Sequence, residues 1–105
     1  MSVSLLRDNK DGSKVIWSHA VSAEEFYWRC WDKGVRENNI RLFRECAEFY
    51  ASDLPEVLDE LQRLKEWTLK ELSKEDSERM VERIEGLQYW IPKECENDGG
   101  MFFLA

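Results

Sequence analysis

Two long amphipathic segments, separated by only a few residues, constrain the fold of this chain more than any other feature. Apolar residues recur at helical intervals from about residue 54 to 72 and again from 80 to 91. Between the two segments, Ser73-Lys74-Glu75-Asp76 has the residue types of a helix start. So short a connection predicts an antiparallel pair of helices, and Pro92 is expected to end the second helix.

The N-terminal part has the pattern of a β-hairpin followed by a helix. Residues 2–7 and 14–19 are short, rich in β-branched and aromatic side chains, and separated by the turn-forming sequence Asn9-Lys10-Asp11-Gly12. A capping-box spacing then precedes apolar residues at helical intervals, which predicts a helix over about 23–33. Gly34 is expected to end this helix in a left-handed conformation.

The remaining segments complete a prediction of fold class. Asn38 or Asn39 can cap a further helix that extends to about residue 50 with one wide apolar stripe. Residues 101–104 are too apolar to lie free in solvent, so we expect a terminal strand that joins the hairpin. The chain is therefore predicted to be one α+β domain over 1–105, with an N-terminal β-hairpin, about four helices and a short C-terminal strand in the sheet.

The charge is unevenly distributed along the chain. The net charge is −7, and residues 52–105 carry fourteen acidic and seven basic side chains, which accounts for essentially all of the excess. Binding to a nucleic-acid backbone requires clustered Lys and Arg, so we expect no nucleic-acid partner. The acidity favours attraction to a basic surface. The alternative is that it only keeps the protein soluble.

The sequence lacks a recognisable catalytic or metal-binding motif. His19 is the only histidine, and Cys30, Cys46 and Cys95 have no zinc-finger spacing, so no catalytic residue, metal or cofactor is predicted. A nucleophilic pair of His19 with Cys30 is the remaining enzymatic alternative. The odd number of widely spaced cysteines, with no leader or long apolar segment, predicts a cytoplasmic protein without a membrane anchor.

Charge and tryptophan placement indicate a partner-binding surface on the helix pair. Two pairs of like-charged residues at four-residue spacing reduce the stability of the helices slightly, and binding of a basic partner would offset this loss. The chain has five tryptophans, more than a small core readily holds, so some ring area should reach the surface and could anchor a partner. A merely solvated acidic face, and tryptophans wholly in the core, are the alternatives. The predicted partner-binding residues are Glu56, Asp59, Glu60, Glu78, Glu82, Trp67 and Trp28.

The stretch Leu54-Pro-Glu-Val-Leu-Asp-Glu-Leu-Gln-Arg-Leu-Lys-Glu66 is followed by a second acidic helix and a short terminal strand. With this arrangement, the chain resembles small bacterial immunity proteins that neutralise polymorphic or contact-dependent toxins. The resemblance implies a cytoplasmic inhibitor, made by the toxin-producing cell, that masks a toxin's active site through a charged protein interface. No site residue is carried over from that family.

Two other functions share these sequence features. One is a structural or regulatory domain that self-associates, with the helices or the edge at Met101–Leu104 pairing between protomers. The other is an acidic mimic of DNA that inhibits a nucleic-acid enzyme. Molar mass in solution distinguishes the first from a toxin inhibitor, and competition by duplex DNA for the same partner distinguishes the second.

Overall fold

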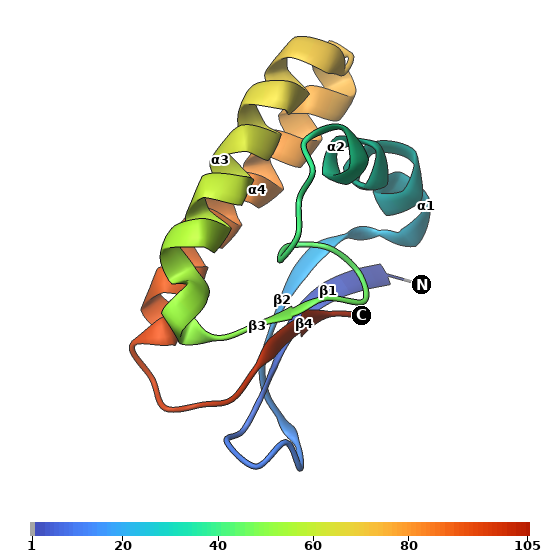
Figure 1. Ribbon diagram of the computed structural model, residues 1–105. Helices are drawn as coiled ribbons and strands as arrows, with labels where there is room; N and C mark the ends of the chain where they lie inside the picture. The colour runs from blue at the N-terminus through green and yellow to red at the C-terminus, as the bar shows by residue number, and fades with distance from the viewer. Residues whose placement is uncertain (1) are drawn as a thin grey trace.

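A computed structural model describes residues 2–105 and has an α+β fold, in which helices cover one face of a four-stranded antiparallel sheet (Figure 1). This confirms the predicted fold class. The strand order is β2-β1-β4-β3. The strands are β1 (Ser2–Asp8), β2 (Val15–Ala23), β3 (Glu48–Phe49) and β4 (Phe102–Leu104).

The predicted hairpin and terminal strand are both present. β1 pairs with β2, and β4 joins the other side of β1, with Leu5 opposite Leu104. β3 pairs with the remaining side of β4, where the Phe49 and Phe102 rings stack with their centroids 4.8 Å apart. The expectation that Met101–Leu104 is an edge open to self-association is therefore wrong, because β4 has a strand on each side.

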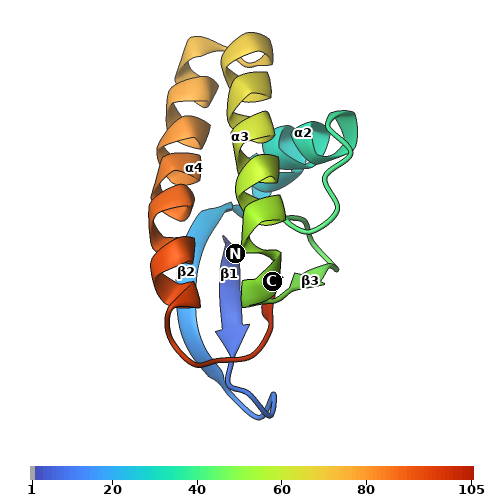
Figure 2. The same cartoon turned by 60° about the vertical axis from the view of Figure 1, so that its left-hand side comes forward.

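The two long helices form the predicted antiparallel hairpin. They are α3 (Leu54–Glu71) and α4 (Lys74–Cys95), and the turn between them lies at the end of the molecule farthest from the sheet (Figures 1 and 2). The predicted end at Pro92 is wrong, because α4 continues to Cys95. Pro92 lacks the N–H for one helical hydrogen bond, and Arg7 Nη1 stabilises the last turn by donating to the Glu94 carbonyl at 2.8 Å.

The helical segment after β2 is longer than expected. It runs through α1 (Glu24–Phe26), a π-helical turn (Tyr27–Trp31) and α2 (Asp32–Glu37). Gly34 does not end it. Instead, Gly34 allows the helix to approach the Trp67 side chain on α3, since a Cβ at this position would lie 2.9 Å from two atoms of the indole ring. The helix ends at Asn38, and Asn39 adopts the left-handed conformation with φ 53°.

The predicted helix between residue 38 or 39 and residue 50 is absent from the described chain. Residues 40–47 are irregular, and β3 follows them. The apolar residues of the expected stripe still contribute to the core, since Ile40, Phe43 and Phe49 are buried. The backbone N–H of Ile40 donates to the Val35 carbonyl at 3.0 Å, whereas that of Phe43 donates to the Glu60 carboxylate at 2.9 Å.

The buried Arg7 joins the C-terminal end of α4 to the sheet. Its guanidinium donates to the backbone carbonyls of Glu94, Asn97 and Gly100 and forms an ion pair with the Glu94 carboxylate at 3.2 Å. The same group lies over the ring of Phe102, 4.6 Å from its centroid. A buried charge is stable only when its donors are satisfied in this way. Arg7 therefore fixes the path of the chain from α4 into β4.

Candidate partner-binding surface

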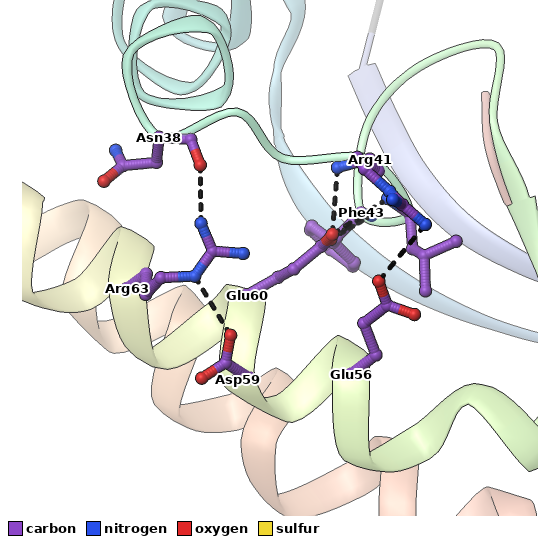
Figure 3. Close-up of polar contacts among 8 residues, drawn as sticks. Asn38, Arg41, Phe43, Glu56, Asp59, Glu60 and Arg63 are labelled. Carbon is purple, nitrogen blue, oxygen red and sulfur yellow. Dashed lines mark hydrogen bonds and ion pairs between the residues drawn. The ribbon is translucent and has the colours of Figure 1, made fainter.

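The five carboxylates predicted to bind a partner do not form one surface. Glu56 and Asp59 lie on the side of α3 that faces the loop of residues 38–44 (Figure 3). Glu56 pairs with Arg41 at 3.5 Å, and Asp59 pairs with Arg63 at 3.0 Å. Both charges are thus partly compensated within the protein, although both side chains remain exposed.

Glu60 is buried against the loop, which the sequence prediction missed. It is only 1% exposed, and its carboxylate accepts hydrogen bonds from the backbone N–H groups of Arg41 at 2.9 Å, Leu42 at 3.1 Å and Phe43 at 2.9 Å (Figure 3). This carboxylate therefore holds the loop in place of helical hydrogen bonds. The prediction that Glu60 contacts a partner is corrected, because the side chain lies inside the protein.

The two predicted tryptophan anchors have different environments. Trp67 is 8% exposed, packs against Gly34 and donates its indole N–H to Glu37 at 3.1 Å, so it belongs to the core and is corrected as an anchor. Trp28 is 49% exposed on the π-helical turn, in edge contact with Tyr27. Some tryptophan area thus reaches the surface, as predicted, but Trp28 lies on a different element from Glu78 and Glu82.

The structure brings Glu78 and Glu82 into a different set, which we call the α4 acidic stripe. Its members are Glu75, Glu78, Glu82 and Glu85. These residues recur at intervals of three and four, so they follow one side of α4, opposite its buried residues, and all four are exposed. Among residues 2–105, the first three form no ion pair, whereas Glu85 pairs with Lys65 at 2.9 Å. Glu75, Glu78 and Glu82 are therefore exposed carboxylates without an ion-pair partner among the described residues.

Tyr89 continues this side of α4, and Trp90 lies one residue, about 100°, further around the helix. Tyr89 follows Glu85 by four residues and is 56% exposed, and its neighbour Trp90 is 47% exposed. Their rings meet edge to face with centroids 4.9 Å apart, and the Lys93 ammonium lies over the Tyr89 ring, 4.8 Å from its centroid. The sequence prediction missed both residues. The spacing 75, 78, 82, 85, 89 is visible in the sequence and could have identified Tyr89.

His19 and Cys30 are the two groups considered for catalysis, and each has a defined environment in the fold. His19 Nδ1 lies 3.0 Å from the carbonyl oxygen of Ala20, and the His19 ring stacks on Trp17. Cys30 is buried, and desolvation raises the pKa of its thiol, which opposes formation of the nucleophilic thiolate. Within the described residues, no group of three His, Cys, Asp or Glu side chains could hold a metal ion.

The α4 acidic stripe has the chemistry of a binding surface. Carboxylates accept charge-assisted hydrogen bonds from Arg and Lys, and adjacent aromatic rings supply apolar area at low entropic cost.

In the part of the chain that the structure describes, no helix is long and apolar enough to cross a membrane. Comparisons of the chain with protein-family models, curated proteins and solved structures find no match.

Proposed function

We propose that this protein binds and neutralises a basic protein effector, and that the effector is a bacterial toxin. The observation that supports the proposal is the α4 acidic stripe, together with the exposed pair Tyr89 and Trp90 at its end. The resemblance to immunity proteins supports the same function. In this proposal the protein acts by occupying the basic cleft of the toxin.

The placement of the charges gives the proposal a physical basis. Glu75 and Glu85 are ten residues apart, so the stripe spans roughly 15 Å along the helix. Like charges on successive turns oppose helix formation by about 0.2–0.5 kcal/mol per pair. A basic partner removes this repulsion on binding and is also attracted from a distance, which accelerates association at low ionic strength.

The aromatic pair gives the interface an apolar centre. Charged rims govern the association rate and the choice of partner, whereas buried aromatic residues contribute most of the affinity in protein interfaces. Tyr89 and Trp90 are more than two-fifths exposed and already constrained by their mutual contact. They can therefore bury apolar area against a partner with little loss of side-chain freedom.

The test uses the protein encoded by the reading frame adjacent to the gene of this chain as the partner. The association rate and Kd are measured for the wild type and for the double variant Glu78→Gln with Glu82→Gln. The matched control is Glu56→Gln with Asp59→Asn, which makes the same change in net charge on α3. We expect the α4 variant to weaken binding at least about tenfold and the α3 variant to change it much less.

A cellular readout completes the experiment. Expression of the adjacent reading frame should arrest growth, and co-expression of this chain should restore it. The proposal is wrong if the neighbouring protein is not toxic, or if this chain neither binds it nor restores growth. Equal effects of the α3 and α4 variants on Kd would place the interface elsewhere on the protein.

A further inference from the structure

β2 is an edge strand, and its outer side has no backbone partner within residues 2–105. It pairs only with β1, and its nine residues contain no Lys, Arg, Asp, Glu or Pro. Proteins protect such edges with charged residues, prolines, β-bulges or a covering helix, and β2 lacks the first two of these. Two register irregularities limit the regular pairing to residues 17–20, but these four still present an open edge. β2 can therefore accept another extended chain as an added strand.

α4 runs beside this edge and forms a pocket with the C-terminal end of β2. Gly86 of α4 lies close to the His19 ring, since a Cβ at this position would be 3.7 Å from it, an ordinary van der Waals contact. Farther along, Ser22 and Phe26 line a pocket of about 280 Å³ together with Arg79 and Arg83 of α4. An extended chain on β2 that reaches residues 21–23 would therefore enter this pocket.

The pocket has a local positive charge in an otherwise acidic protein. Among the described residues, neither Arg79 nor Arg83 forms an ion pair, and the Arg79 guanidinium lies over the Phe26 ring at 5.3 Å. Glu82 is the one carboxylate among the residues that line the pocket. Two uncompensated guanidinium groups against one carboxylate favour an anionic ligand.

We propose that the edge of β2 binds an extended acidic segment of another protein, with a carboxylate of that segment between Arg79 and Arg83. Backbone hydrogen bonds to β2 supply the pairing, and the arginines fix the register and direction of the added strand. A second copy of this chain fits less well, because its β2 contains no carboxylate and the net charge of −7 opposes self-association. The proposal does not depend on the α4 acidic stripe.

The probe is a random library of peptides about nine residues long, matching the length of β2. The library is selected on the intact wild-type protein and, separately, on the double variant Arg79→Glu with Arg83→Glu. We expect selection on the wild type to enrich Asp and Glu toward one end of the peptide. Selection on the variant should lose this enrichment. Absence of acidic enrichment on the wild type, or the same enrichment on both proteins, overturns the proposal.

The strongest peptide is then measured by fluorescence anisotropy. Arg79→Glu with Arg83→Glu should weaken binding at least about tenfold, while Arg36→Glu with Arg44→Glu, which makes the same charge change elsewhere, should alter it less than about twofold. Glu82→Gln should strengthen this binding although it weakens binding of a basic effector, so the two proposed sites are distinguished by opposite signs. Unchanged affinity after reversal of Arg79 and Arg83 overturns the proposal.

Methylation of the peptide backbone tests strand addition without changing charge. Two versions of the peptide carry N-methyl groups on alternate residues, one version for each side of the extended chain. Only the version methylated on the side that faces β2 should lose binding, because a methylated nitrogen cannot donate to the edge. Equal binding by both versions overturns strand addition. If sedimentation shows a stable dimer of this chain that does not bind the peptide, the proposal that β2 binds a segment of another protein is overturned.

Discussion

Replacement of Glu60 by Gln should destabilise the protein although it changes only one oxygen to an amide nitrogen. The carboxylate accepts from three backbone N–H groups, those of Arg41, Leu42 and Phe43, at distances of 2.9–3.1 Å. A Gln amide keeps one acceptor and places an NH₂ donor against at least one of these N–H groups. Hydrogen bonds to a charged group contribute about 1.5–3 kcal/mol each, and neutral ones about 1 kcal/mol. Loss of one such bond, at about 1.5–3 kcal/mol, and weakening of the other two, at about 0.5–2 kcal/mol each, predict that the free energy of unfolding falls by at least about 2.5 kcal/mol.

Urea unfolding followed by far-UV circular dichroism measures this difference. The matched control is Glu56→Gln, one turn earlier on α3, where the exposed pair with Arg41 contributes at most about 1 kcal/mol. We expect Glu60→Gln to reduce the free energy of unfolding by at least about 1 kcal/mol more than the control does. If both variants are equally stable, the Glu60 carboxylate does not hold the loop.

Gly34→Ala should destabilise the protein by about 1–3 kcal/mol, because its Cβ would overlap the Trp67 ring. Gly86→Ala should instead stabilise the protein by about 0.5–1 kcal/mol, since its Cβ meets only ordinary contacts. In thermal unfolding, the Tm should therefore fall for Gly34→Ala and rise for Gly86→Ala. The Arg29 guanidinium lowers the pKa of the Asp76 carboxyl below its ordinary 3.8. The pair therefore stabilises the fold at neutral pH, and this stabilisation is lost as the pH falls through the lowered pKa. Asp76→Asn should therefore have a Tm that depends less on pH below about 4 than the wild type does; an unchanged pH profile contradicts the assignment.

Local sequence signals were sufficient for the elements whose stability comes from their own pattern. The leucine period and the cap at Ser73 predicted the helix pair to within a few residues, because an amphipathic helix must bury its apolar side. The turn sequence between β1 and β2 likewise predicted the hairpin. The placement of Phe102 beside β1 followed from its apolar character at the end of the chain.

Elements determined by tertiary contacts could not be predicted in this way. Ile40 and Phe43 have the spacing of a helix, but their segment is held by the Glu60 carboxylate, which lies on a helix that begins many residues later. Gly34 has the local signature of a helix end, but the approach of Trp67 gives it a different role. In both cases a contact distant in sequence overrides the local preference.

The exposure of the candidate partner residues was predicted only in part for a related reason. Glu56 and Glu60 are four residues apart and have the same sequence signature, yet one is exposed and the other is buried under the loop of residues 38–44. Sequence alone does not show which turn of an acidic helix meets such a loop. Glu78 and Glu82, which no such loop covers, remain exposed on α4, while Tyr89 becomes recognisable once the buried side of the helix is known.

We propose that the outward side of α4 is the surface that binds a basic effector. The Kd between the chain and the protein of the adjacent reading frame tests this proposal, with Glu78→Gln plus Glu82→Gln compared against Glu56→Gln plus Asp59→Asn. We expect the α4 variant to bind at least about tenfold more weakly, with a smaller loss at high ionic strength, and the α3 variant to change little. An α4 variant that binds as tightly as the wild type at low ionic strength would contradict it.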